Sequence, residues 1–169
     1  MYQYKEENIG SEPITLDEAK AFMRVSFDSD NAQIEAIIKR VRQMAEQILS
    51  RSFVTKTITY YEEVAESEVI KLPFPNHSQV LNVYVNGVDM VGDTVVRGLT
   101  QLSIIGDFAG KELKVKYSTD GTLETGIKSA MLKEIVNQYQ NKDSYYLENA
   151  GEATDRFRGM LKSYVKMSF

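Results

Sequence analysis

The hydrophobic pattern of the chain changes its period after Ser50, and this change constrains the fold more than any other feature of the sequence. Residues 31–49 place apolar side chains at spacings of three and four, which is typical of one face of an α-helix. From Phe53 to Val64 the period is two, and β-branched and aromatic residues are frequent, which favours a β-strand. The sequence therefore predicts that a helical part gives way to a sheet.

Helices are expected before this sheet. After a polar lead-in, the stretch "PITLDEAKAFMRV" places Thr15 three residues before Glu18, which is the spacing of a capping box. This spacing predicts a first helix that runs to about Val25. A second helix, capped by Asp30, is expected to follow and to end near Ser50.

Helical spacing returns after the sheet, in "IKSAMLKEIVNQYQ" and in a last amphipathic segment within residues 151–166. The apolar stripe of this last segment consists of Phe157, Met160, Leu161, Tyr164 and Val165. Such a stripe suits either the core of the subunit or an interface with another protein. Both alternatives remain open at this point.

Short strands are expected between the second and third helices. Residues 53–64 and 69–72 are expected to form a hairpin across the acidic turn "AESE", and the prolines of "LPFP" end its second strand because proline has no N–H donor. Asn86-Gly87 lies between two β-like runs and predicts a second, tight hairpin. Further strands are predicted at residues 95–97, 102–105 and 113–117.

The predicted fold class is therefore α+β. About four helices form a body, and a small antiparallel β insert lies between the second and third of them. The chain has 169 residues, which is within the usual size of one domain.

Composition narrows the possible functions. The chain contains no cysteine, which removes disulfides, thiolate catalysis and cysteine-based zinc sites. Its net charge of −4 is not the basic excess of a protein that grips nucleic acid. No apolar run approaches the ~20 residues that span a bilayer, and the first residues show no apolar core of a secretory signal. We expect no membrane partner, and we expect the protein to be made and to fold in a cytoplasm.

Two stretches resemble ligand sites but lack a necessary part. "GDFAGKE" has three residues between its glycines instead of four, and Glu112 follows the lysine where a phosphate loop has Ser or Thr. Asp28 and Asp30 have the spacing that opens a calcium loop, but the glycine of the sharp bend is missing. We interpret the first stretch as a turn and the second as the cap of a helix.

The remaining polar candidates are also expected to be structural. The single histidine, His77, is expected in a loop, without another histidine or a cysteine to complete a zinc site or a triad. The carboxylates at 62, 63, 66 and 68 surround a turn and are expected to be solvated. In "KRVR", Val41 is expected to face inward, while the solvent face is assigned to Lys39, Arg40 and Arg42. We therefore expect no catalytic residue, no metal and no cofactor.

Several motifs, taken in order, resemble the head-tail connector proteins (adaptor or head-completion proteins) of long-tailed phages. "PITLDEAKAFMRVSFDSDNAQIEAIIKRVRQMAEQIL" is similar to the family's short capped helix, acidic turn and long helix. "LPFPNHSQVLNVYVNG" resembles the family's proline corner before a valine-rich strand and hairpin, although Phe74 separates the two prolines. "KVKYSTDG" and "IKSAMLKEIVNQYQNKDSY" are similar to the later strand and helix, although "QNKDSY" replaces the usual arginine. The likeness covers about residues 13–145.

The resemblance implies a structural virion protein and not an enzyme. Its subunits are expected to form a ring, typically twelvefold, that binds under the portal protein and links the DNA-filled capsid to a stopper or tail component. Genome DNA is expected to pass through the ring without sequence-specific binding. The implied location is the virion, with host cytoplasm during assembly, and the gene belongs to a phage or a prophage. The implied single connector domain, 1–169, divides into N-terminal helices (1–50), β insert (52–118), third helix (122–140) and C-terminal helix (151–166).

In the context of this resemblance, the C-terminal segment is expected to bind a partner, with the portal as the expected one. The polar stretch "NKDSYYLENAGE" before it would let the last helix swing away, and large apolar side chains anchor interfaces. The expected partner-binding residues are Phe157, Leu161, Tyr164 and Val165.

Two other classes of function remain open. A cytoplasmic regulator that binds nucleic acid would need a basic recognition helix. A small enzyme would need a pocket with at least two perturbed titratable groups. Neither feature is visible in the sequence.

Overall fold

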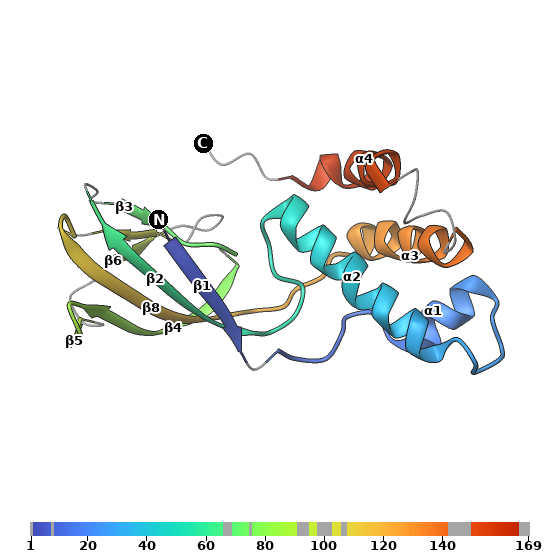
Figure 1. Ribbon diagram of the computed structural model, residues 1–169, viewed down its shortest axis with the longest axis horizontal. Coiled ribbons are helices and arrows are strands. Elements are labelled where there is room, and N and C mark those ends of the chain that lie inside the picture. Colours follow the sequence, from blue (N-terminus) through green and yellow to red (C-terminus); the bar gives the residue numbers. More distant parts are fainter. Residues whose placement is uncertain are drawn as a thin grey trace. The chain divides into compact units, whose positions relative to one another are not determined.

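Figure 1 shows the chain as a computed structural model, which describes residues 2–7, 9–65, 69–74, 76–90, 95–97, 103–105, 108–141 and 150–165. The chain divides into two compact units. The unit that we call the helical unit contains Glu12–Leu49 and Leu123–Met167. The other, called the sheet unit, is formed mainly by residues 2–11 and 50–122. Each unit is described by itself.

The helical unit is built around the long second helix. Within the described residues its elements are α1 (Leu16–Met23), α2 (Asn31–Leu49), α3 (Thr125–Gln140), α4 (Ala150–Leu161) and the short 3-10 helix η1 (Lys162–Tyr164). Helix α2 packs against α1, α3 and α4, and α3 also packs against α4. The predicted apolar stripe of α2 is confirmed by the buried side chains of Ile34, Ile37, Ile38, Val41, Ala45 and Leu49.

Local hydrogen bonds explain where the first two helices begin. The N–H of Glu18 donates to Thr15 Oγ1 at 3.2 Å, which confirms Thr15 as the cap of α1. Arg24, with a φ of 58°, ends α1 in the left-handed conformation. The carbonyl of Asp30 accepts from the N–H of Ile34 at 2.9 Å, so α2 begins directly after Asp30.

The sheet unit contains two antiparallel sheets. The larger has the strand order β1-β2-β8-β4-β5, and the smaller has the order β3-β7-β6. The strands of the larger sheet are β1 (Tyr2–Glu7), β2 (Thr57–Val64), β4 (His77–Val85), β5 (Val88–Asp89) and β8 (Lys111–Thr119). Those of the smaller sheet are β3 (Val69–Lys71), β6 (Val95–Arg97) and β7 (Ser103–Ile105).

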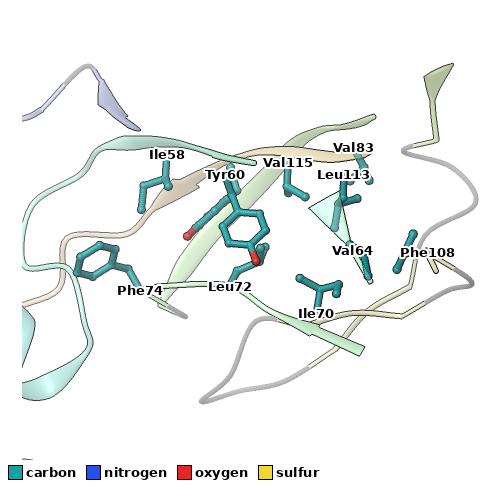
Figure 2. Close-up of a cluster of buried hydrophobic side chains, with 11 residues drawn as sticks. Ile58, Tyr60, Val64, Ile70, Leu72, Phe74, Val83, Phe108, Leu113 and Val115 are labelled. Carbon is teal, nitrogen blue, oxygen red and sulfur yellow. The ribbon is translucent and has the colours of Figure 1, made fainter. Parts of the chain in front are cut away.

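The core of the sheet unit lies on one face of the larger sheet, as Figure 2 shows. Alternate residues of β8 are fully buried there, namely Leu113, Val115 and Tyr117. They belong to the same cluster as Ile58 and Tyr60 of β2, and as Ile70, Leu72 and Phe74 from β3 and the corner that follows it. Because side chains of a strand alternate between its two faces, the residues between these buried positions form the opposite face of the sheet.

The predicted fold class is confirmed: helices combine with an antiparallel sheet, most of which lies between α2 and α3 in the chain. The strands predicted near 95–97, 102–105 and 113–117 correspond to β6, β7 and β8. The tight hairpin is confirmed as well, because Val85 pairs with Val88 and the two turn residues have positive φ, 49° at Asn86 and 79° at Gly87.

One prediction about the sheet is wrong, and one strand was not predicted. Strand β2 does not form a hairpin with β3; it pairs with β1 on one side and β8 on the other, so both of its edges are occupied. Strand β3 pairs with β7 in the smaller sheet. The polar lead-in is in fact the edge strand β1, paired with β2 over its whole length from Tyr2 to Glu7.

Candidate interaction surfaces

The stretch that resembles a phosphate loop is a turn before a strand. Phe108 is buried in the sheet core, Gly110 has a φ of 69°, and Lys111 and Glu112 already belong to β8. Gly106 and Asp107 lie outside the described residues. Because the lysine enters a strand and not a helix, the loop presents no helix N-terminus to a phosphate.

The two aspartates that resemble a calcium loop contact different partners. Lys20 Nζ lies 2.6 Å from Asp28 Oδ1, and this hydrogen bond lowers the pKa of Asp28. The hydroxyl of Tyr139 donates to Asp30 Oδ2 at 2.7 Å, and this hydrogen bond raises the pKa of Tyr139. In the described part of the chain, no three residues with carboxylate, imidazole or thiol groups gather as metal ligands.

The remaining polar candidates have separate positions. Glu62 accepts a hydrogen bond from the hydroxyl of Tyr60, while Glu63 is exposed at the opposite face of β2. Glu66 and Glu68 lie outside the described residues. The loop position predicted for His77 is wrong, because its backbone lies in β4 and pairs with Thr119.

Arg42 was assigned to solvent by its position in "KRVR", and this prediction is wrong. Only 1% of Arg42 is exposed, although Lys39 is exposed as expected. Arg42 Nε lies 2.8 Å from Glu12 Oε2, and Arg42 Nη1 lies 2.7 Å from Glu46 Oε2. Burial opposes the charge of Arg42, but the two carboxylates outweigh it and raise its pKa. Three helices cover α2, so part of its polar flank is also buried.

A second buried cation lies in the sheet unit and has no counterpart in the sequence analysis. Lys56 is 1% exposed, and its Nζ atom lies 2.9 Å from Glu6 Oε1 in β1. The same ammonium group is 4.1 Å from the centroid of the Phe74 ring. The carboxylate of the edge strand therefore neutralises a lysine that precedes β2.

The structure divides the apolar stripe of the C-terminal segment. Phe157 and Leu161 are fully buried in the helical unit, where α4 packs against α2 and α3. Tyr164 is half-buried, and its hydroxyl lies so close to Gly126 that a Cβ atom there would overlap it. Val165 is 45% exposed. In this conformation, the surface that a partner can reach is the end of the stripe at Tyr164 and Val165.

The hairpin tip between β4 and β5 is a second candidate surface. Val88 is 61% exposed, and Asn86 and Gly87 are exposed beside it. The tip is fixed to β8, because the N–H of Asn86 donates to the carbonyl of Glu112 and Asn86 Oδ1 accepts from the N–H of Glu112, both at 2.8 Å. A rigid turn thus presents an apolar side chain to solvent.

Solved structures with a similar fold come from gene transfer agent particles. A protein from the virion of a native gene transfer agent particle matches with a TM-score of 0.72 and 8% identity, over 97% of this chain and 96% of that chain. A protein from the neck of an empty gene transfer agent particle, computed with C6 symmetry, matches with a TM-score of 0.60 and 9% identity. This match covers 91% of this chain and 95% of that chain. A protein from the neck of the native particle, computed with C12 symmetry, matches with a TM-score of 0.54 and 10% identity. This match covers 92% of this chain and 94% of that chain.

A match to a family of sequences is more specific than these similarities of fold. Residues 13–87 match the phage gp6-like head-tail connector proteins. This stretch includes α1, α2 and the hairpin turn, and it confirms the resemblance found in the sequence. The chain therefore has a fold similar to that of proteins from gene transfer agent necks and virions, and residues 13–87 are similar to phage gp6-like head-tail connector proteins. No match was found among curated protein sequences.

Proposed function

We propose that this chain is one subunit of a ring that connects the head of a phage-like particle to its tail. The observation that carries the proposal is the connector signature over residues 13–87, together with the similarity of nearly the whole chain to neck subunits. The symmetric necks of those particles support a homo-oligomeric ring, and we propose twelve copies by analogy with the C12 neck. The chain acts as one connector domain over residues 1–169, and it has no catalytic role.

We further propose that the ring binds the portal protein on one side and a stopper or tail component on the other, with genome DNA passing through its centre. The C-terminal end of the helical unit, Tyr164 and Val165, is the proposed portal contact. The hairpin tip at Val88 is the proposed contact for the other side. Phe157 and Leu161 would reach a partner only after α4 leaves α2 and α3, so we assign both residues a structural role in the isolated subunit.

Binding to purified portal rings from the same phage tests this proposal. Co-sedimentation should show the chain bound at the portal, and Val165→Asp should weaken binding at least tenfold while leaving the fold intact. Ser163→Asp is the matched control, because it adds the same charge at an exposed position of the neighbouring 3-10 helix. Equal loss with both variants, or no binding of the unmodified chain, contradicts the proposal.

Leu161→Asp separates the structural role from the binding role. This variant should unfold the isolated subunit, because a carboxylate buried without a partner is strongly unfavourable. Circular dichroism at 222 nm measures the outcome. A folded Leu161→Asp subunit that no longer binds the portal would instead show that α4 detaches to form the interface.

A further inference from the structure

The outer face of the larger sheet, opposite the buried cluster, contains a hollow of about 350 Å³. Four neighbouring strands contribute to it, and Figure 1 shows them side by side in the order β1, β2, β8, β4. Its lining consists of Tyr84 and of Lys5, Glu7, Thr59, Asn82, Lys114 and Lys116. Every lining residue has a side chain with a polar group, and Tyr84 also contributes an aromatic ring.

The strand register explains why these side chains meet. Lys5 pairs with Thr59, Thr59 pairs with Lys116, and Lys116 pairs with Asn82, so these residues form one row across four strands. Lys114 occupies the next outward position of β8, about 7 Å along the strand from Lys116. Because strands lie about 4.8 Å apart, Lys5 and Lys116 are about 10 Å apart across the row.

The hollow carries an excess of positive charge in a chain whose net charge is negative. Three lysines face one carboxylate, which leaves two positive charges in excess. Lys5 Nζ lies 2.7 Å from Glu7 Oε1, and this hydrogen bond, with the charges of Lys116 and Lys114, lowers the pKa of Glu7. Lys114 Nζ lies 5.9 Å from the centroid of the Tyr84 ring. The site is therefore cationic and only partly neutralised from within.

The other end of the same face has the opposite charge. Glu63 of β2 lies directly opposite Glu112 of β8, and both are exposed. Like charges in directly opposed positions repel each other and also repel a phosphate. An anionic polymer on this face is thereby confined to the lysine end.

We propose that this hollow is a contact site for the backbone phosphates of duplex DNA. The inference rests on the proposed function, in which DNA passes through the ring. The lysine ammonium groups, the hydroxyl of Thr59 and the amide of Asn82 can all donate hydrogen bonds to phosphate oxygens. An acidic protein segment is disfavoured as the occupant because the lining contains no aliphatic residue to pack against an apolar anchor. Glu7 weakens the contact, which lets DNA slide past the site.

The charge balance sets the expected salt dependence. With about two phosphates neutralised per subunit, the logarithm of the binding constant should fall with the logarithm of salt concentration with a slope of about −1.8. A fourfold rise in salt should then weaken binding about 12-fold. Glu7→Gln removes the opposing carboxylate, so its slope should approach −2.7 and the same rise in salt should weaken binding about 40-fold.

Amide chemical shifts of the full chain, titrated with a 12-base-pair duplex at low salt, test the proposal at residue resolution. The shifts should concentrate on β1, β8 and β4 around the hollow, and Glu7→Gln should bind more tightly. Lys114→Glu with Lys116→Glu should abolish these shifts. The matched control is Lys39→Glu with Lys133→Glu, which changes the charge equally at exposed positions of the helical unit and should leave the shifts in place.

Three results would overturn the proposal: no shifts at the hollow, an equal loss with the control variant, or shifts produced by a hexaglutamate peptide and not by DNA. The last result would identify a docking surface for an acidic protein. The Lys114→Glu, Lys116→Glu variant should still bind portal rings like the unmodified chain. Failure of the unmodified chain to bind portal rings would instead contradict the connector function. The DNA titration would still test the phosphate contact, because it does not involve the portal.

Discussion

The helical unit and the sheet unit each bury one cation, but they neutralise it differently. Arg42 in the helical unit pairs with two carboxylates, and the side chain of one of them, Glu46, is only 4% exposed. Lys56 in the sheet unit pairs with Glu6, whose side chain is 28% exposed, and lies over the ring of Phe74. A guanidinium has donors for two carboxylates, whereas an ammonium group is a compact charge that an aromatic face also stabilises.

This difference shows which unit depends on its buried ion pair. Loss of Arg42 would leave Glu46 buried without this cation, while loss of Lys56 would leave a carboxylate that water already reaches. In both units, one of the paired carboxylates comes from the N-terminal residues, Glu12 for Arg42 and Glu6 for Lys56. Glu6 and Glu12 therefore each neutralise the buried cation of one unit.

The largest effect is expected from Arg42→Ala. Breaking a buried pair by removing one partner costs about 3–5 kcal/mol, which corresponds to a fall in melting temperature of about 10 °C for a chain of this size. Thermal unfolding at 222 nm measures it, with the exposed Lys39→Ala as the control on the same helix. If both variants melt within about 2 °C of each other, the buried pair does not stabilise the helical unit.

A smaller effect is expected in the sheet unit from Gly87→Val. Gly87 has a φ of 79°, and a β-branched residue in the left-handed region costs roughly 1–2 kcal/mol, or a few degrees in melting temperature. Val88→Thr is a control at the adjacent exposed position and should change stability by at most about 0.5 kcal/mol. An unchanged melting temperature for Gly87→Val would show that the tight turn contributes nothing to the sheet unit.

Lys56→Met should cost only about 1 kcal/mol. Methionine has a similar length and keeps the apolar contact with Phe74, while Glu6 regains water at the edge strand. Chemical denaturation of this variant beside Arg42→Ala tests the comparison of the two buried cations directly. A loss as large as that of Arg42→Ala would show that the two cations are equally important and that exposure of the paired carboxylate does not matter.

The smallest effect at neutral pH concerns two buried tyrosines of the sheet unit. Burial raises the pKa of Tyr60 and of Tyr117 above the ordinary value of about 10. Above pH 10 the unfolded chain therefore loses protons that the folded chain retains, so stability falls as pH rises and is unaffected below about pH 9. Denaturation midpoints between pH 8 and 11 should show this fall. If all ten tyrosines of the folded chain ionise at about pH 10, as measured by phenolate absorbance, the raised pKa values of Tyr60 and Tyr117 are contradicted.

The parts of the fold that depend on neighbours in sequence could be predicted from the sequence. The stripe of α2, the cap at Thr15 and the turn at Asn86-Gly87 are local signals, and all three are confirmed. Strand β1 could not be predicted in this way. It is short, carries Lys5, Glu6 and Glu7, and becomes a strand because its backbone pairs with β2, whose paired residues lie at least 50 positions later in the chain.

The candidate surfaces were less predictable, for the same physical reason. Helical spacing identifies the C-terminal stripe, but only the packing of α2 and α3 decides that Phe157 is buried while Val165 is exposed. The lysine hollow joins Lys5 to Lys116 through the strand register, so no segment of the sequence contains the cluster. Burial of Arg42 likewise depends on a carboxylate 30 residues earlier.

The most direct test of the connector function is a cryo-electron microscopy reconstruction of the neck of particles that carry this chain. We expect a ring of twelve copies below the portal, with density that both units fit and with DNA or an open channel at the centre. A neck whose density is fully explained by other proteins, with no copy of this chain in the ring below the portal, would contradict the proposal.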